Sequence, residues 1–277
     1  LDHNKTHYQP ISWEDAYALI GEEIKALDDP SEALFYTSGR ASNEASFVYQ
    51  LFARALGTNN LPDCSNMCHE SSGVALGETI GIGKGTVRLE DFEEAGAIFV
   101  IGQNPATNHP RMLSALQKAA RNGTKIVSVN PLPEAGLIGF RHPQELKGML
   151  GVTTPLASLH LPVRLGGDQA LFQGIAKILI ERDGGAHSKI DHAFITKHTK
   201  GFETLKDQVA NLQWSTLEKL SGLSRKQIEA AADIITDSKA TIYCWAMGLT
   251  QHVHSVPTLQ QVVNVCLLCG DIGRPGA

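Results

Sequence analysis

The chain has 277 residues, of which 42% are hydrophobic and 19% are charged, so it can bury a core and is not a disordered tail. At about 100–200 residues per domain, this length predicts one large domain or two. The 24 basic and 29 acidic residues give a formal net charge of −5, which argues against a nucleic-acid partner because such binders usually carry a basic surplus. No segment approaches the ~18 apolar residues of a membrane span, and five cysteines are too few for a disulfide scaffold.

The two ends of the sequence predict that it belongs to a longer protein. It begins at Leu1 without a signal-like segment, and it ends in residues 273–277 (GRPGA), which have the composition of a turn. The sparse, scattered cysteines favour a reducing compartment or a metal-binding role. We therefore expect a cytoplasmic protein.

The first part of the chain predicts two helices with a short strand between them. One helix begins at Ser12 or Asp15 and runs to Leu27, and the second covers about residues 43–56. The short apolar run 33–36 (ALFY) predicts the strand. Residues 59–85, which follow, are loop-rich.

Further along, apolar runs that predict strands alternate with segments of helical periodicity. The predicted strands cover residues 97–102, 126–129, 159–163 and 240–246, and the predicted helices cover 110–121, 168–181, 224–237 and 256–268, with shorter helices in 188–221 and a poor periodic pattern in 132–155. This alternation indicates βαβ crossovers. The predicted fold is therefore α/β: a doubly wound, mainly parallel sheet with helices on both faces (αβα), plus part of a second α/β domain.

Such sheets bind ligands at the carboxyl ends of their strands, where the strand order reverses. The loop 102–110 (GQNPATNHP) combines a glycine with amide side chains and leads into a helix N-terminus, a setting that favours an anion. The loop 164–168 (RLGGD) has a similar composition, and Asn130 ends a predicted strand where a ribose contact is common. Taken singly, the loop 102–110 is equally consistent with an ordinary turn, the loop 164–168 by itself favours a plain helix cap, and Asn130 is at least as consistent with an Asn-Pro turn.

The most reactive-looking segment is 63–73 (DCSNMCHESSG), in which Cys68 is followed by His69. A cysteine beside a histidine can act as a nucleophile with its base, or as a thiolate metal ligand with a proton acceptor nearby. The residues alone do not choose between these two roles.

A zinc site would need Cys64 and Cys68 to be joined by Cys266 and Cys269. The latter two lie in an apolar run with helical spacing, so we expect them to be buried as small hydrophobic residues, and we expect the same of Cys244 in its predicted strand.

Together these segments resemble the molybdopterin oxidoreductase family, which comprises the large catalytic subunits of formate dehydrogenases and related enzymes. The chain is most similar to formate dehydrogenase-like alpha subunits. The resemblance covers almost the whole chain and is carried by residues 10–16 (PISWEDA), 66–73 (NMCHESSG), 101–105 (IGQNP), 247–251 (MGLTQ) and 270–276 (GDIGRPG).

The resemblance implies molybdenum or tungsten held by two molybdopterin guanine dinucleotides (bis-MGD). Cys68 matches the family's metal ligand, a role that suits a soft thiolate, and His69 matches the histidine that handles the substrate proton. The residues that match cofactor-binding segments are Gly102, Gln103, Asn104, Asn108, Asn130, Arg164, Gly166, Asp168, Gly248 and Gln251. The implied substrate is a small molecule such as formate, and its electrons would pass to a 4Fe-4S cluster outside this chain and then to an unknown acceptor.

The sequence departs from the family pattern in ways that shape these expectations. Glu70 and Ser71 stand where formate dehydrogenases commonly have Gly-Pro, and Asn130 stands where an aspartate is common. The family's active-site arginine lies beyond the chain. We expect residues 1–63 to form part of an α/β domain completed downstream, and residues 64–277 to form the αβα molybdopterin-dinucleotide-binding domain. The chain alone is expected to be inactive and could be free of cofactor.

Two alternatives belong to other functional classes. One is a guanine-dinucleotide-binding module without enzymatic activity, which would contain no metal. The other is a metal-free thiol enzyme that uses Cys68 with His69, which alkylation of Cys68 would inactivate.

Overall fold

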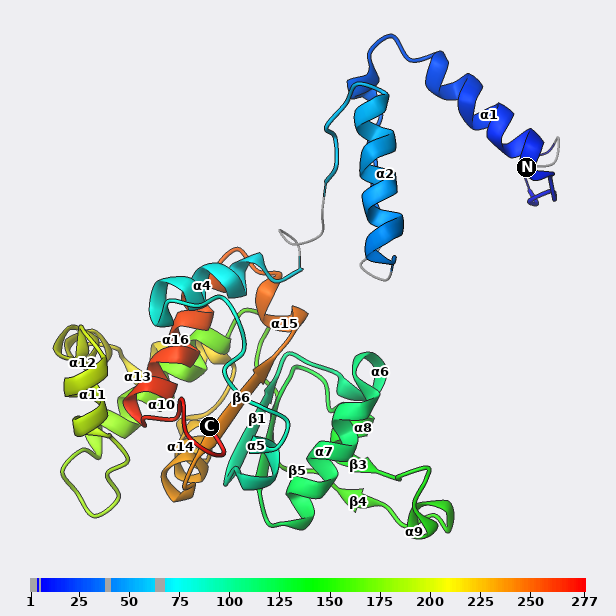
Figure 1. Ribbon diagram of the computed structural model, residues 1–277. Coiled ribbons are helices and arrows are strands. Elements are labelled where there is room, and N and C mark those ends of the chain that lie inside the picture. The colour runs from blue at the N-terminus through cyan, green and yellow to red at the C-terminus, as the bar shows by residue number, and fades with distance from the viewer. Residues whose placement is uncertain (1–3, 5, 38–40, 63–67) are drawn as a thin grey trace. The chain divides into compact units, whose positions relative to one another are not determined.

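The computed structural model describes residue 4 and residues 6–37, 41–62 and 68–277. The chain divides into two compact units, Leu1–Ser65 (unit 1) and Asn66–Ala277 (unit 2) (Figure 1). The predicted domain boundary at residues 63 and 64 stays a prediction.

Unit 1 contains two helices, α1 (Trp13–Lys25) and α2 (Asn43–Ala55), and the short 3-10 helix η1 (Pro30–Glu32). Each α-helix begins after a serine, Ser12 or Ser42, whose side chain accepts a hydrogen bond from a backbone N–H of the first turn. These caps satisfy N–H groups that have no partner inside the helix, so both helices begin where the sequence predicts.

The strand predicted over residues 33–36 is wrong, because these residues are extended but form no strand pair. The Phe35 N–H donates to the Asn60 carbonyl at 2.9 Å, and the Phe35 ring packs edge-on against Tyr49 and Phe52. Within the described part of unit 1 there is no neighbouring strand, so a single backbone bond takes the place of a ladder.

Unit 2 contains a four-stranded sheet, a small two-stranded sheet and the remaining helices. The strands are β1 (Ala97–Ile101), β2 (Lys125–Val129), β3 (Gly139–Phe140), β4 (Thr154–Pro155), β5 (Ala157–Leu161) and β6 (Thr241–Trp245). The helices are α4 (Glu70–Ile80), α5 (Asp91–Glu94), α6 (Pro105–Asn108), α7 (Pro110–Arg121), α8 (Ala135–Ile138), α9 (Leu146–Met149), α10 (Asp168–Glu181), α11 (His192–His198), α12 (Phe202–Ala210), α13 (Trp214–Ser221), α14 (Arg225–Asp237), α15 (Met247–Thr250) and α16 (Ser255–Leu268).

The four-stranded sheet has the order β5-β2-β1-β6, and all of its pairs are parallel. At the carboxyl end, Ile101 of β1 aligns with Val129 of β2 and with Trp245 of β6. The chain moves outward from β1 to β2 and β5 and then returns to the other side of β1 as β6. The strand order therefore reverses between β1 and β6, as the predicted doubly wound sheet requires.

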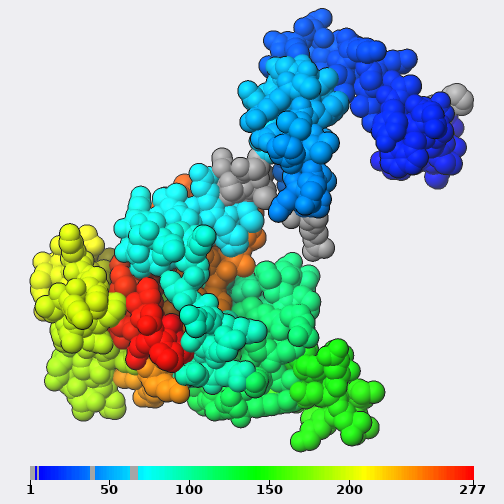
Figure 2. Space-filling model, viewed as in Figure 1, coloured from blue at the N-terminus to red at the C-terminus, as the bar shows by residue number. Residues whose placement is uncertain are grey.

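The sheet separates two hydrophobic cores, and residues alternate between them along β1. Phe99 and Ile101 pack with α10, α14 and α16, whereas Ile98 and Val100 pack with α7 on the opposite face (Figure 1). All five residues of β1 are fully buried, as expected for a parallel strand covered on both sides. In Figure 2, α16 (red) lies at the surface between α4 (cyan) and the α11–α12 segment (yellow). The αβα fold is thus confirmed.

Helix α4 was not predicted, because the sequence indicates loops over residues 59–85. Its sequence, ESSGVALGETI, is rich in glycine and serine, which are weak helix formers. The helix nevertheless buries Ala75 and Leu76 and packs against α16. Tertiary packing therefore overrides local propensity here.

Candidate functional site

A cavity of about 370 Å³ opens where the strands of the large sheet end. We call it the strand-end cavity. Eight of the ten predicted cofactor-binding residues line it, namely Gly102, Gln103, Asn104, Asn108, Asn130, Gly166, Asp168 and Gly248. They come from the loops that follow β1, β2, β5 and β6, so the fold brings together segments that are up to 146 residues apart in sequence (248 − 102 = 146).

The floor of the cavity is a direct contact between two backbones at the point where the strand order reverses. Gly102 follows β1 with a φ of +56°, and the Gly248 N–H donates to its carbonyl at 3.0 Å. A Cβ atom on Gly102 would lie 2.7 Å from the Gly248 Cα, and one on Gly248 would lie 2.4 Å from the Gly102 Cα. Only glycine fits at either position, so the loops after β1 and β6 are held together there.

Asp168 supplies a buried acidic group to this cavity. It is the first residue of α10 and is only 4% exposed. Burial raises the pKa of Asp168 to about 6, against the lowering effects of its own backbone N–H and of nearby His252. An ionised carboxylate here would be stabilised by a ligand that donates hydrogen bonds to it.

The lining of the cavity also contains the carboxylate of Glu134, which accepts hydrogen bonds from two amide side chains. Asn104 Nδ2 donates to Glu134 Oε2 at 2.6 Å, and Asn130 Nδ2 donates to Glu134 Oε1 at 3.3 Å. Asn130 is the residue that stands where the family commonly has an aspartate. Glu134, four residues later, therefore places a carboxylate beside that position.

Arg164 and Gln251 do not line the strand-end cavity. The guanidinium of Arg164 donates to the Lys219 carbonyl at 3.1 Å, at the end of α13. Gln251 caps α15, and its backbone N–H donates to the Met247 carbonyl. Their predicted contacts with a cofactor stay predictions.

Next to the strand-end cavity lies a second cavity, which we call the histidine cavity. Its lining includes His69, Ser72, Cys244 and Trp245, and Gln103 lines both cavities. His69 Nδ1 lies 3.3 Å from Ser72 Oγ, which accepts a hydrogen bond from Trp245 Nε1 at 2.9 Å. The imidazole is thus tied to the carboxyl end of β6.

Cys68 directly precedes His69 and is a half-buried free thiol. The start of α4 is fixed to α15 by the Ser71 hydroxyl, which donates to the Thr250 carbonyl at 3.2 Å. His69 therefore lies beside the carboxyl end of β6, and Gln103 lines both the histidine cavity and the strand-end cavity, whereas Cys68 is not among the residues that line either one. The roles predicted for Cys68 and His69 stay predictions.

The other cysteines are placed as hydrophobic residues. Burial raises the pKa of both Cys244 and Cys266 to about 12 and raises the pKa of Cys269 further. Within the described ranges, no three histidine, cysteine or acidic side chains are arranged to hold a metal ion. Cys64, which the zinc alternative needs, lies outside the described residues.

Sequence reasoning did not single out Glu134, which lines the strand-end cavity, and it considered His252 only as part of a polar loop suited to contacts with a ligand. Glu134 follows the proline-rich stretch after β2, where no periodicity marks it. His252 bonds back to the Gly248 carbonyl through Nε2. The position of His252 just after the last strand was its only sequence signal.

The chain matches the molybdopterin oxidoreductase family over residues 3–277. It belongs to that family, as the sequence motifs predict. It is 52% identical over 272 residues to an uncharacterized oxidoreductase of Mycobacterium tuberculosis (strain ATCC 25618 / H37Rv), with 98% of this chain and 35% of that protein covered.

More distant relatives include formate dehydrogenase H of Escherichia coli (strain K12), which is 28% identical over 97% of this chain and 35% of its own length. The acetylene hydratase structure from Pelobacter acetylenicus aligns with a TM-score of 0.69 and 21% identity, over 99% of this chain and 34% of that one. The chain thus spans about a third of the length of the proteins it matches. None of the helices in the described part of the chain has the length and apolarity needed to cross a membrane.

Proposed function

We propose that this chain contributes one dinucleotide site and the metal-ligating cysteine to a molybdenum- or tungsten-dependent oxidoreductase. The observation that carries the proposal is the strand-end cavity. Its lining combines the close contact between Gly102 and Gly248, the buried carboxyl group of Asp168, and a glutamate carboxylate that two amide side chains hold in place. The relatives support oxidation of a small substrate, and one is named a formate dehydrogenase. Electrons would pass to an iron–sulfur cluster outside these residues and then to an acceptor protein, and a cytoplasmic location is part of the same proposal.

The residues present fit the guanosine diphosphate half of a molybdopterin guanine dinucleotide. The Asp168 carboxylate can accept the N1–H and N2–H donors of guanine, whereas adenine offers no such pair of donors. The close approach of Gly102 and Gly248 keeps side chains out of the cavity floor, and the start of α10 favours a nearby anion.

Glu134 is the group that we assign to the ribose. Carboxylates at strand ends of doubly wound sheets commonly accept hydrogen bonds from ribose hydroxyls. Asn130 lacks a carboxylate, and Glu134 supplies one within 3.3 Å of its amide. The two amides orient Glu134 while leaving acceptor positions on its oxygens for the sugar.

Cys68 would hold the metal, since a thiolate suits a sulfur-rich coordination sphere. When bound, the molybdenum or tungsten centre supplies the two-electron redox chemistry. His69 would accept the proton released from the substrate, and Ser72 would orient the ring through its hydrogen bond to Nδ1. We expect the chain alone to be inactive, because it spans only about a third of the length of its relatives.

Binding of guanosine diphosphate to the full chain, measured by calorimetry, tests the dinucleotide site. We expect GDP to bind at least tenfold more tightly than ADP, and Asp168→Asn to remove most of that preference, because a hydrogen bond to a charged group contributes about 1.5–3 kcal/mol. Glu134→Gln should reduce the preference for GDP over its 2′,3′-dideoxy analogue. Equal binding of GDP and ADP would contradict the assignment.

Metal and pterin analysis of the full-length protein tests the enzymatic part. We expect one molybdenum or tungsten and two pterins per chain, and loss of the metal in Cys68→Ala. Guanine-nucleotide binding without metal would instead favour the binding module. Activity in metal-free protein that alkylation of Cys68 abolishes would favour the thiol enzyme.

A further inference from the structure

The histidine cavity, of about 430 Å³, has one permanently charged side chain among the described residues that line it, and that charge is positive. Lys84 supplies the ammonium group, whereas no aspartate or glutamate of the described chain lines the cavity. Besides His69, the lining groups that could ionise are Cys244 and Tyr243, and both stay neutral because burial raises the pKa of each. The lining therefore favours an anion over a neutral or cationic ligand.

The position of Lys84 is set by the glycines around it. Helix α4 ends at Gly81, which has a φ of +78°. Gly83 then packs against the backbone of Gly73, so closely that a Cβ on Gly83 would lie 3.1 Å from the Gly73 Cα. The Gly73 N–H in turn donates to the His69 carbonyl at 3.0 Å. The chain at Lys84 is thus held beside the first turn of α4, next to His69.

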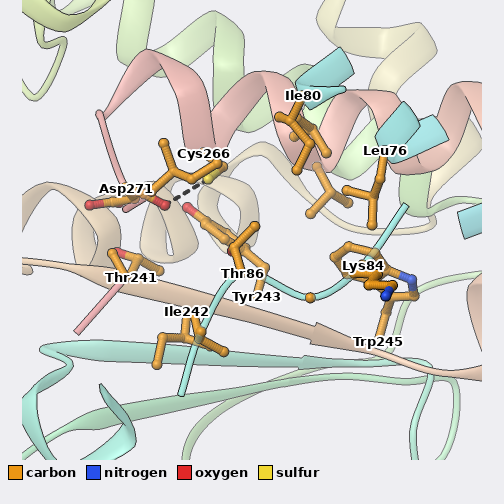
Figure 3. Close-up of a pocket in the computed structure, with 16 residues that line it drawn as sticks. Leu76, Ile80, Lys84, Thr86, Thr241, Ile242, Tyr243, Trp245, Cys266 and Asp271 are labelled. Carbon is orange, nitrogen blue, oxygen red and sulfur yellow. Dashed lines mark hydrogen bonds between the residues drawn. The ribbon is translucent and has the colours of Figure 1, made fainter. Parts of the chain in front are cut away.

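The ammonium group of Lys84 is not used within the described part of the chain. No hydrogen bond or ion pair joins it to another described residue, whereas Lys118 of α7 is paired with Glu93. Lys84 is exposed, and with Trp245 it also lies at one end of the neighbouring cavity between β6, α4 and α16 (Figure 3). A ligand in the histidine cavity can therefore reach this charge and pair with it.

A buried amide at the same cavity also lacks a partner. Gln103 is 8% exposed, and its Nε2 donates to the Met112 sulfur at 3.4 Å. Because Met112 lines the histidine cavity and not the strand-end cavity, the amide end of Gln103 lies on the side of the histidine cavity. Gln103 Oε1 has no hydrogen-bond partner among the described residues. A buried acceptor of this kind is normally paired by water or by a ligand, so the cavity suits a polar occupant.

We propose that Lys84 binds the carboxylate of a small organic acid in the histidine cavity, and that it selects such anions over neutral molecules of the same size. The inference rests on the proposed function, because it places the substrate in the same cavity as His69, the residue assigned to the substrate proton. Gln103 Oε1 would accept a hydrogen bond from a hydroxyl or another donor of the same acid. Lys84 is thereby a residue that determines substrate specificity.

Binding of matched acids and amides to the full-length protein, purified as it is produced, tests the proposal. The probes are formate, acetate and glycolate against formamide, acetamide and glycolamide, which have similar shapes without the charge, and saturation-transfer NMR measures the affinities. We expect the acids to bind more tightly, and Lys84→Met to reduce that preference about three- to fivefold, the range of an ion pair that solvent reaches. Lys84→Arg should retain the preference. Lys226→Met is the control, because it removes another exposed lysine, on α14, and it should change nothing.

Two results of this measurement would overturn the proposal: an unchanged preference in Lys84→Met, or no preference for the acids in the wild-type protein. Metal and pterin analysis of the same samples separates the proposal from the proposed function. We expect equal contents in the wild type and in Lys84→Met, and a loss of cofactor from this variant would overturn the proposal by assigning Lys84 to the cofactor. Selection of the acids through Lys84 in a protein without metal would support the anion site and contradict the proposed function.

Discussion

Helices α2 of unit 1 and α10 of unit 2 have similar lengths and amphipathic sequences but very different surroundings. Of the 13 residues of α2, only Ala53 is buried, whereas Phe47 and Val48 are 59% and 62% exposed. In α10, ten of 14 residues are buried between the sheet and α13, α14 and α16. Periodicity therefore predicts the helix and its apolar face, but it does not say whether the chain itself contains the surface that covers that face.

The largest expected effect comes from truncating matched phenylalanines in the two helices. Phe172 of α10 is fully buried, so we expect Phe172→Ala to destabilise unit 2 by about 3–5 kcal/mol in urea unfolding followed by circular dichroism. Phe47→Ala should change the same transition by less than about 0.5 kcal/mol. Comparable losses would show that α2 packs on unit 2 in solution.

A second comparison concerns two glycines of unit 2 that both adopt positive φ. We expect Gly102→Ala to cost more than about 2 kcal/mol, because the new Cβ would overlap the Gly248 backbone in addition to its φ penalty. Gly123→Ala, with a φ of +92° and open space around it, should cost only the φ penalty of about 1–2 kcal/mol. Equal costs in urea unfolding would contradict the close contact between the loops.

The pH dependence of nucleotide binding tests whether the ionised carboxylate of Asp168, in unit 2, is the group that binds the nucleotide. Its pKa of about 6 means that the carboxyl is mostly protonated at pH 5, so GDP should bind about tenfold more weakly there than at pH 7. The free chain should change in the opposite direction. Because its folded pKa exceeds the unfolded value, this group stabilises the fold below about pH 4 and loses that contribution as the pH rises through 6.

Calorimetry of the wild-type chain at both pH values checks the binding part of this prediction. The control is Asp168→Asn, in which the difference between pH 5 and pH 7 should largely disappear. A pH dependence that persists in this variant would assign it to another group.

The smallest expected effect comes from the helix caps. Ser224 and Gln227 form a capping box at the start of α14, and Ser224→Ala should destabilise unit 2 by about 1 kcal/mol. Ser42→Ala removes the equivalent cap from α2 and should leave the unit 2 transition where it is. A shift of that transition by Ser42→Ala would show that the two units unfold together.

Much of unit 2 could be predicted because its signals are local. The residues of α7 and α10 match the predicted bounds, since Pro110 suits a first helical turn and Asp168 a helix start. The glycines and polar side chains in the loops after the strands likewise predicted most of the residues that line the strand-end cavity. These loops come together because parallel strands end at one edge of the sheet.

The failures depend on contacts that are distant in sequence. Helix α4 forms because α16 covers its small residues, and residues 33–36 form no strand because the described residues of unit 1 provide no partner strand. Arg164 donates to the Lys219 carbonyl, 55 residues further along, and its predicted contact with a cofactor stays a prediction. Glu134 was missed because a proline-rich stretch has no periodicity, and only the fold shows that two amides hold it.

The crossing of Gly102 and Gly248 has a consequence for protein engineering. Because each position excludes a Cβ through the other's backbone, saturation mutagenesis at either one should return only glycine, and changing both together gives no relief. Mutant libraries intended to alter nucleotide preference should therefore vary the acidic residues that line the cavity, Asp168 and Glu134, and keep the two glycines constant.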